Sequence, residues 1–553
     1  MRKKVLIILL NTFFVQFAQG QQTNKTIEKK IDSIFSKWDN LKTPGLSVAV
    51  LTDNKVTYSK GFGIANLEYG IPNRTNTVFD IASLSKQFTA FSIALLVQSG
   101  KISLDDDIRK YIPELYDFEK KIKIEHLLSH SSGLRDQNEL LYLSGWKQED
   151  IITNENILSL IFKQKELNFS PGEQFKYCNS GYTLLALVIE RVTKIPFSEW
   201  AYKNIFKPLK MKNTFFITSN NQVIKNRAYS YSNGDLGYEK NLINSTTIGA
   251  RGLQSTIEDL SLWVLNFTNH TVGSNDVFTK INSIPENLQV KYNYGQAFNK
   301  YKELSVIEHD GSDAGYRTYI GRFPDQKFAI IILSNSSSIN PKTLAMQVAE
   351  IFLFKQTVSS TIQTKEKDKI EVPESVEKGM EGQFQIANDK ILTVWADDHA
   401  LKANINSEEK LYYLMPISKT AFEIKELNAK ISFKKGTEQA ADSIIYRTES
   451  GLSVLPKIFV EDELSRKLLE YEGEYYSDEL GVSYKISKVN NTLKVELPRD
   501  FFISLKKQND DNFTGSYYWF RRVKFVRNES SKLVGFEIST GRSYNIRFVR
   551  KNS

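Results

Sequence analysis

The sequence predicts an α/β (α+β) domain followed by two small antiparallel β-barrel domains. Helical and strand-like periods alternate from Lys25 to Phe354, which is typical of a mixed domain. The composition changes after Phe354, and the rest of the chain is a series of short strand-like segments that repeat once. At 553 residues the chain is also longer than one hydrophobic core usually supports, so several domains are expected.

The mixed region contains two hairpins and one clear helix. Residues 46–51 and 56–61 alternate like paired strands around a polar turn, and residues 320–323 and 328–333 do the same around a Pro-Asp turn. Residues 83–99 form the clearest helix, and the glycine that follows occupies the position that helix C-caps prefer. The hairpins predict antiparallel strands in this domain.

A linker and a repeat complete the chain. Residues 356–376 are rich in Lys, Glu, Ser and Thr and poor in large apolar side chains, which is typical of a linker. We expect barrels at 377–462 and 463–553, because segments of the first recur in the second at an offset of 91 or 92 residues. Convergent composition of two β-rich segments is the alternative explanation. The matching pairs are Phe384 and Tyr475, Leu401 and Leu493, Phe422 and Phe513, and the segments that begin at Ile431 and Val523.

The N-terminus has the pattern of an export signal. Three cations at residues 2–4 precede an apolar run at 5–17, and residues 18–20 offer the small side chains that a signal peptidase needs. The run is too short to span a bilayer, which takes about 18 apolar residues, and a short buried helix is the alternative. We therefore predict a signal peptide at 1–20 and an exported protein, periplasmic or secreted, with no membrane span after cleavage.

Charge and cysteine content narrow the class of protein. The formal net charge is +9, but the basic residues beyond the signal are scattered, which is weak evidence for nucleic-acid binding. Cys178 is the only cysteine, which excludes an intramolecular disulfide and a thiolate metal cluster. His126 and His130 have a spacing that can chelate zinc on a helix, but no third ligand pattern follows. We therefore expect neither a metal nor a cofactor.

Ser83 and Lys86 are a candidate nucleophile and base. They lie three residues apart, which places them side by side on one face of the predicted helix. An apolar stripe lies roughly 150° around the helix from this pair, so the pair is not simple core filling. At the first turn the helix dipole favours an alkoxide-like Ser83 and a neutral amine on Lys86. The stripe consists of Ile81, Leu84, Phe88, Phe91 and Leu95.

A second segment carries Tyr177 and Asn179. It follows a Pro-Gly pair and precedes a helical run, so we expect it on a turn that faces a cleft. Tyr177 is a candidate proton relay, and Asn179 is a candidate ligand for a substrate amide. A tyrosine packed at a helix start is the structural alternative. Cys178 should turn away from the cleft and pack.

A third segment carries His309, Gly311 and Ser312. On an extended strand His309 and Gly311 face the same side, so a donor projects into the cleft while the glycine leaves the backbone open to substrate. The amide of Ser312 is then expected to join that of Ser83 in an oxyanion hole. A structural histidine is the alternative for His309.

In this order, Ser83-Leu84-Ser85-Lys86, Tyr177-Cys178-Asn179 and His309-Asp310-Gly311 resemble the serine β-lactamase and penicillin-binding-protein superfamily, which carries Ser-x-x-Lys, Tyr-x-Asn and Lys-Thr-Gly or His-x-Gly. The class C members of this superfamily also resemble the chain at three further segments, residues 100–105, 124–134 and 252–256. The resemblance implies, for residues 21–355, a β-lactamase/transpeptidase-like domain with an antiparallel sheet flanked by helices and an active site between two lobes.

The resemblance also implies an activity. Ser83 would form an acyl-enzyme, Lys86 and Tyr177 would move protons, and water would release the product. His309 replaces the lysine of penicillin-recognising members, which weakens the case for a β-lactam carboxylate. A histidine at this position is usual among the family's esterases and D-aminopeptidases.

The order of one hydrolase domain and two barrels resembles the D-stereospecific aminopeptidases, whose barrels are similar to lipocalins. We therefore expect a D-aminopeptidase, D-Ala-D-Ala carboxypeptidase-like enzyme or esterase that acts on a small molecule or short peptide. A β-lactamase, or a receptor that binds penicillin or cell-wall peptides without turnover, is the alternative. The oligomeric state is left open.

Overall fold

The computed structural model describes residues 25–551, except 236, 285–290, 355–378, 388–389, 398–399, 407–409, 436–440, 449–450, 457–467, 490–491 and 510. The predicted signal peptide at 1–20 and linker at 356–376 lie outside the described residues. Within the part of the chain that is described, no helix is both long enough and apolar enough to cross a membrane.

The chain divides into two compact units. The first takes its residues from Met1–Leu134, Gln148–Ser159 and Phe169–Ser359. The second takes Arg135–Lys147, Leu160–Asn168 and Ser360–Ser553. This division differs from the domain boundaries predicted from the sequence, because two segments from within 21–355 belong to the same unit as the barrels.

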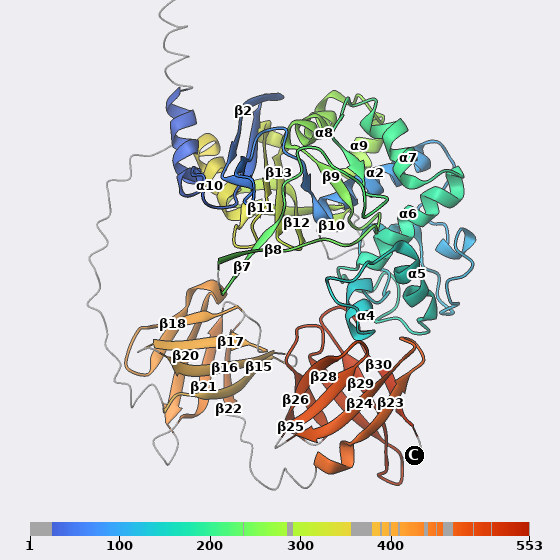
Figure 1. Cartoon of the computed structure of the whole chain (residues 1–553), viewed down its shortest axis with the longest axis vertical. Helices are drawn as coiled ribbons and strands as arrows, with labels where there is room; N and C mark the ends of the chain where they lie inside the picture. Colours follow the sequence, from blue (N-terminus) through green and yellow to red (C-terminus); the bar gives the residue numbers. More distant parts are fainter. Residues whose placement is uncertain are drawn as a thin grey trace, which may run out of the picture. The chain divides into compact units, whose positions relative to one another are not determined.

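A seven-stranded sheet forms the centre of the first unit (Figure 1). All of its neighbouring strands are antiparallel, and both predicted hairpins are confirmed. In sheet order the strands are β10 (Tyr292–Asn293), β11 (Gln296–Tyr301), β12 (Leu304–Asp313), β13 (Tyr316–Phe323), β14 (Phe328–Ser334), β1 (Leu46–Thr52) and β2 (Lys55–Phe62).

Helices cover the sheet on both faces, as the continuous burial of β14 requires. Ile330 and Ile332 belong to a core cluster that includes residues of α10 (Pro341–Leu353) and of the helical residues 25–35. The alternate side chains point to the other face, where α8 (Ile257–Asn269) packs on β1 and β14.

The remaining helices of this unit lie around α2 (Ser85–Gln98), which contacts α6 (Asn179–Thr193) and α9 (Asn275–Ile281). The prediction of a single apolar stripe on this helix is wrong. Nearly all of its side chains are buried, because α2 also meets the Trp263 ring of α8. Helix α5 (Asn154–Lys163) has its residues up to Ser159 in this unit and the rest in the second. The other elements are α3 (Ile124–Leu128), α7 (Phe197–Ala201), and the short strands β3 (Ile64–Asn66), β4 (Ile71–Pro72), β5 (Phe79–Asp80), β6 (Phe215–Phe216), β7 (Tyr231–Gly234), β8 (Gly237–Lys240) and β9 (Leu253–Ser255).

Two eight-stranded antiparallel sheets follow in the second unit, as predicted. The first curls so that β15 also contacts β22, and the second is a closed barrel. The strands of the first are β15 (Gly382–Ala387), β16 (Lys390–Asp397), β17 (Ala400–Ile405), β18 (Tyr412–Pro416), β19 (Ala421–Ile424), β20 (Ala429–Lys435), β21 (Ala441–Thr448) and β22 (Gly451–Pro456); those of the barrel are β23 (Gly473–Ser477), β24 (Val482–Val489), β25 (Thr492–Leu497), β26 (Phe501–Asn509), β27 (Asn512–Gly515), β28 (Arg522–Arg527), β29 (Leu533–Ser539) and β30 (Ile546–Arg550).

The repeat seen in the sequence corresponds to equivalent strands of the two sheets. Each matched pair lies on the first, third, fifth or sixth strand of its own sheet, and every matched side chain points into a core. Convergent composition does not require this agreement of strand position, so the structure supports a duplicated barrel. The buried pairs are Phe384 and Tyr475, Leu401 and Leu493, Phe422 and Phe513, and Ile431 and Val523.

The closed barrel binds the Arg135–Lys147 segment of its own unit. The side chain of Arg135 is fully buried and pairs with Glu479, at 2.6 Å from Nη1 to Oε1. Glu139 on α4 (Gln137–Leu143) is also buried, and its carboxylate accepts the backbone N–H of Arg542 at 2.9 and 3.0 Å. Buried polar contacts of this kind make the segment a fixed part of the barrel's surface.

Candidate active site

Ser83 lies in a 3₁₀ turn, Ala82–Leu84, that leads directly into α2. The helix therefore begins two residues later than the sequence predicts. The residue before the nucleophile candidate, Ala82, has a φ of +50°, in the left-handed region that alanine rarely adopts. Such a conformation persists only where neighbouring contacts hold it, and these outliers cluster at functional sites.

Lys86 is fully buried, and its amine contacts groups from three separate segments of the chain. Its Nζ lies 2.8 Å from the backbone oxygen of Ala250, 2.8 Å from Oδ1 of Asn179 and 3.2 Å from Oγ of Ser83. Both oxygens at 2.8 Å can only accept hydrogen bonds, so each takes one N–H of the lysine.

This arrangement determines what faces Ser83. In the ammonium form, the third N–H of Lys86 donates to Ser83 Oγ. In the neutral form the amine carries a lone pair, and the Ser83 hydroxyl lies 3.2 Å from it while Ala250 and Asn179 accept N–H bonds of the same amine. Lys86 can therefore accept the Ser83 proton without moving, which is what a general base requires.

Tyr177 lies beside the same lysine. Lys86 Nζ is 4.9 Å from the centre of the Tyr177 ring, and the rings of Tyr177 and His309 are 6.3 Å apart. Cys178, between Tyr177 and Asn179, is 2% exposed, and its thiol lies 3.3 Å from the backbone oxygen of Leu134. The structure thus brings the Ser83, Tyr177 and His309 segments together, and Cys178 packs away from them.

His309 is buried and uses both ring nitrogens within the protein. The Nδ1–H group donates a hydrogen bond to the backbone oxygen of Asp310 at 2.5 Å, and Nε2 lies 2.8 Å from the Tyr292 hydroxyl. Burial lowers the pKa of His309 to about 4, and nearby Lys86 acts in the same direction. His309 is therefore neutral at pH 7, and the donor that the sequence leads us to expect in the cleft is used to orient the ring instead.

Gly311 lets β12 approach the nucleophile turn. A Cβ on Gly311 would lie 2.2 Å from Thr318 Oγ1, 2.7 Å from the Ile81 oxygen and 3.1 Å from Ala82 Cβ. No side chain fits there, so glycine is required for contact between the strand and the turn.

Ser312 is exposed at the end of the same strand. Beyond Glu308, β12 pairs only with β13 among the described strands, and at Gly311 it lies against the nucleophile turn. The role of the Ser312 amide in an oxyanion hole stays a prediction.

Sequence reasoning missed three parts of the site, which are Tyr292, the carbonyl of Ala250 and His130. The His130 ring lies 4.2 Å from that of Tyr177, and its Nδ1 accepts the N–H of Cys178 at 3.1 Å. The sequence pointed to His130 only as a possible zinc ligand and as part of the 124–134 segment, Tyr292 stands at no motif position, and a backbone carbonyl has no sequence pattern at all. Within the described residues, no group of three or more His, Cys, Asp or Glu side chains is arranged to hold a metal ion.

Comparison with known proteins defines the family. Residues 27–350, more than half of the chain, match the Beta-lactamase family. The chain belongs to this family. In the structure of this chain Ser83, Lys86, Tyr177 and His309 lie in one region, which is the arrangement that the resemblance in the sequence implies.

The chain is also similar to individual proteins and solved structures. It is 25% identical over 418 residues to penicillin-binding protein 4* of Bacillus subtilis (strain 168), covering 71% of the chain and 91% of the relative. The octameric penicillin-binding protein homologue from Pyrococcus abyssi has a similar structure, with a TM-score of 0.55 and 21% identity over 86% of this chain and 99% of that one. D-amino acid amidase from Ochrobactrum anthropi SV3, complexed with L-phenylalanine amide, gives a TM-score of 0.50 and 21% identity over 59% of this chain and 98% of that one.

These comparisons confirm the predicted fold class and superfamily, and they indicate a hydrolase of the β-lactamase and penicillin-binding-protein type. The structural neighbours are less than 25% identical to this chain, so they show the fold alone.

Proposed function

We propose that the chain is an exported serine hydrolase that cleaves amide or ester bonds of small substrates, D-configured amino-acid derivatives among them, through an acyl-enzyme on Ser83. The observation that carries this proposal is the position of Lys86, whose amine is held by Asn179 and Ala250 while its third direction faces Ser83 Oγ.

The proposed reaction proceeds in two halves. Ser83 Oγ forms a bond to the substrate carbonyl carbon while its proton passes to Lys86 Nζ. The bond to the leaving amine or alcohol then breaks, and this group takes the proton, relayed by Tyr177. In the second half a water molecule adds to the acyl carbon, gives a proton back to Ser83 Oγ and releases the acid.

The neutral state of His309 supports a preference among substrates. A β-lactam carboxylate calls for a cation at this position, and a histidine with a pKa of about 4 supplies none near pH 7. Amides and esters do not carry that charge next to the scissile bond. The likeness to an amidase that acts on D-amino acids supports the same choice.

A hydrolysis panel tests the proposal. Purified wild type, Ser83→Ala and the control Ser92→Ala are compared on D-amino-acid amides, a D-Ala-D-Ala peptide, nitrocefin and p-nitrophenyl esters. Ser92 is a buried serine of the same helix that donates to the Phe88 oxygen at 2.7 Å, so the control keeps the site intact. We expect turnover by wild type and Ser92→Ala that is abolished in Ser83→Ala.

Two outcomes contradict this function. If wild type and Ser83→Ala behave identically on every substrate, Ser83 is not the nucleophile. If a labelled penicillin or fluorophosphonate forms a lasting adduct on Ser83 and no substrate turns over, the receptor that binds without turnover replaces the enzyme.

The proposed export has its own test. Expression of the full chain in a Gram-negative host, followed by N-terminal sequencing of the periplasmic or secreted protein, should show a mature chain that starts after Gly20. An unprocessed chain that stays in the cytoplasm would contradict export without affecting the hydrolase proposal.

A further inference from the structure

The strained residue before the nucleophile is held on both of its polar backbone groups. The N–H of Ala82 donates to Oδ1 of Asp80 at 2.7 Å. Its carbonyl accepts the hydroxyl of Ser85 at 2.6 Å, and Ser85 in turn accepts the N–H of Leu253 at 3.2 Å. Hydrogen bonds with Asp80 and Ser85 therefore hold the N–H and the carbonyl of Ala82 in place while its φ is +50°.

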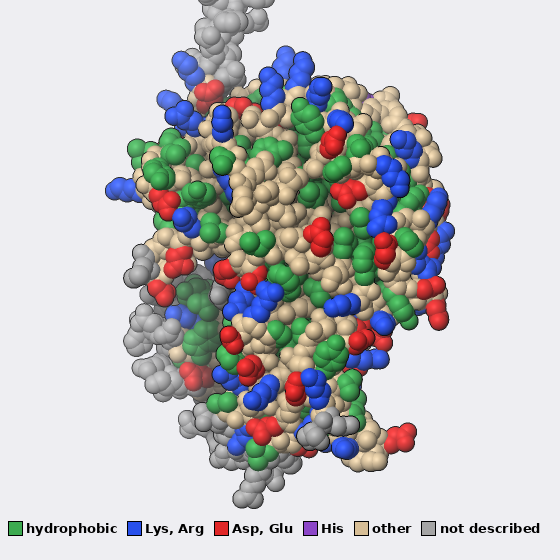
Figure 2. Space-filling view, turned by 45° about the vertical axis from the view of Figure 1, so that its right-hand side comes forward, with side chains coloured by type: hydrophobic (Ala, Val, Ile, Leu, Met, Phe, Trp, Pro, Cys, Tyr) green, Lys and Arg blue, Asp and Glu red, His purple; other side chains and the backbone are tan. Residues whose placement is uncertain are grey.

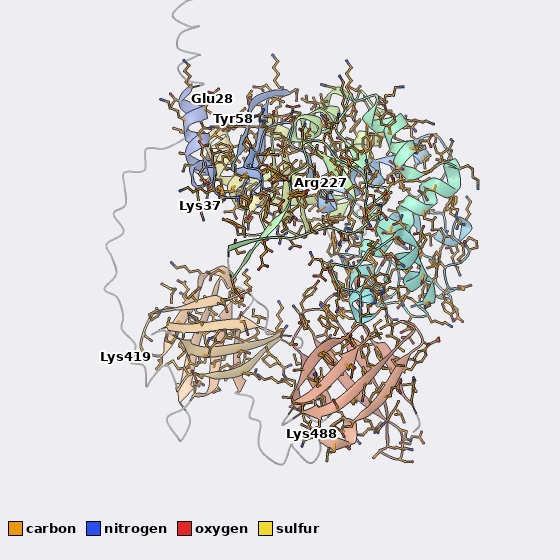
Figure 3. The ribbon with its side chains drawn as sticks, viewed as in Figure 1. Glu28, Lys37, Tyr58, Arg227, Lys419 and Lys488 are labelled. Atoms are coloured by element: carbon orange, nitrogen blue, oxygen red, sulfur yellow. The ribbon has the colours of Figure 1, made fainter. Side chains whose placement is uncertain are left out.

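Asp80 is itself anchored deep in the protein. It is 1% exposed, and its second oxygen, Oδ2, accepts Nε2–H of Gln254 at 2.6 Å. Burial raises the pKa of this carboxyl, while the charges of Arg251 and Arg227 act in the opposite direction. Arg227, labelled in Figure 3, belongs to the same unit and forms an isolated parallel β-bridge with Val78. A buried carboxyl that is stabilised by two hydrogen bonds and two nearby arginines has a role that simple core filling does not explain.

The charged residues near Asp80 link it to the base, to the nucleophile turn and to β12. Arg251 follows Ala250, whose carbonyl holds Lys86, and Arg251 also forms an ion pair with Asp313. Asp313 follows Ser312 on β12, the strand that reaches the nucleophile turn through Gly311. The base, the nucleophile turn and β12 thus adjoin one cluster of charged side chains, in which Asp80 is buried and Arg251 and Asp313 are partly exposed.

We propose that Asp80 is a positioning residue of the reaction, which holds Ala82 in its left-handed conformation through the hydrogen bond to the Ala82 N–H and thereby directs Ser83 Oγ towards Lys86. The inference rests on the proposed function, because it assigns Asp80 a part in the chemistry of Ser83. Asp80 touches neither the substrate nor Ser83.

The physical argument is one of competing backbone conformations. Alanine prefers a negative φ, so without its hydrogen bond Ala82 relaxes and rotates the peptide that leads into Ser83. The 3.2 Å contact between Ser83 and Lys86 then lengthens, and a displacement of about 1 Å can lower the rate of an oriented reaction on the order of 100-fold.

A pair of substitutions at Asp80 separates the hydrogen bond from the charge. Asp80→Ala removes the acceptor, so we expect kcat to fall about 10- to 100-fold with KM changed less than about threefold. Asp80→Asn keeps an oxygen for the Ala82 N–H. Gln254 can turn its amide so that Oε1, which has no partner among the described residues, accepts from the new NH₂ group. We therefore expect Asp80→Asn to stay within about fivefold of wild type.

The matched control is Asp259→Ala. Asp259 is a buried carboxylate that also accepts a backbone N–H, from Asn213 at 2.6 Å, but it makes no contact with the nucleophile turn. We expect this variant to melt at a lower temperature while kcat stays within about twofold of wild type, which separates loss of stability from loss of positioning.

A second substitution tests the conformational argument directly. Glycine adopts a positive φ without strain, so in Ala82→Gly the hydrogen bond to Asp80 is less necessary for this backbone conformation. In the double variant Asp80→Ala with Ala82→Gly, we expect kcat to recover at least about half of the logarithmic loss caused by Asp80→Ala alone.

Several results would overturn the proposal. These are an Asp80→Ala enzyme with the kcat of wild type, an Asp80→Asn enzyme as slow as Asp80→Ala, or a double variant with no recovery. A crystal structure of Asp80→Ala in which Ala82 keeps its positive φ and Ser83 its distance to Lys86 overturns it as well, and this measurement needs no activity. Failure of the proposed function is distinct, because wild type itself then shows no turnover that depends on Ser83.

Discussion

The hydroxyl of Tyr292 donates to Nε2 of His309 across 2.8 Å, and this contact defines the state of the histidine. With Nδ1–H donated to the Asp310 carbonyl, the ring is the neutral tautomer that carries its proton on Nδ1. The ring is buried beneath a surface on which Figure 2 shows acidic and basic side chains interspersed on the face in view.

Tyr292→Phe should change the pH dependence of the reaction. A hydrogen bond donated to the neutral ring disfavours the imidazolium, so its loss raises the pKa of His309 from about 4 towards its ordinary value. We expect the activity of the variant, relative to wild type, to be about fivefold lower at pH 5 than at pH 8. Tyr294→Phe is the control, because this buried hydroxyl has no partner among the described residues. Equal pH–rate profiles for wild type and Tyr292→Phe would contradict the assignment.

Gly311→Ala should inactivate the enzyme. The new Cβ would meet both Thr318 Oγ1 and the Ile81 oxygen, so β12 must move away from the nucleophile turn, and kcat/KM should fall more than about 100-fold. Adding Thr318→Ala should not restore it, because the backbone oxygen at 2.7 Å stays in place. Gly70→Ala is the control for a Cβ without a collision, since nothing lies within 4 Å of that Cβ; the positive φ of Gly70, which Gly311 does not share, adds only backbone strain. Recovery in the double variant would show that the strand does not need this close approach.

Glu479→Ala should destabilise the second unit strongly. It removes the closer of two carboxylates that pair with Arg135, whose side chain is fully buried, and Glu166 stays at 3.7 Å, so we expect the loss of one hydrogen bond to a charged group, about 1.5 to 3 kcal/mol. The neighbouring Asp478→Ala removes an exposed pair with Lys165, which is worth less than about 1 kcal/mol. Denaturant unfolding of the full chain compares the two variants. Equal stability of both would show that the Arg135 pair does not hold the segment.

Glu139→Gln should stabilise the protein at high pH. Burial, with the neighbouring charge of Asp136, raises the pKa of Glu139 to about 7, so the folded state binds more protons than the unfolded state between about pH 4.5 and 7. Stability is therefore lost as the pH rises through this window. We expect the difference in Tm between Glu139→Gln and wild type to be more positive at pH 8 than at pH 5, measured by thermal melts. Glu496→Gln, at an exposed position on β25, controls for net charge, and a difference that is the same at both pH values would contradict the prediction.

Motifs and local periods account for what the sequence predicted correctly. The hairpins depend on alternation within short segments, and Ser83, Lys86, Tyr177 and His309 depend on motifs whose order is specific. The burial of α2 on nearly all sides was not predictable, because it depends on elements far along the chain, such as the Trp263 ring.

The site residues that were missed share a physical cause. Asp80 acts on a backbone N–H and Tyr292 on a ring nitrogen, and each contact depends on where folding brings a strand or a turn. The positive φ of Ala82 has no signal either, because alanine is not a residue whose presence indicates this conformation.

The division of the chain into two units has a consequence for synthesis. On the ribosome, Arg135 is made 344 residues before Glu479, and Glu139 is made 403 residues before Arg542. During synthesis the Arg135–Lys147 segment is therefore exposed before its partners in the last barrel have been made. Exposed surfaces of this kind are where chaperones bind and proteases cut. A stop codon within the last barrel would then remove the surface that completes an earlier part of the polypeptide, as well as the barrel itself.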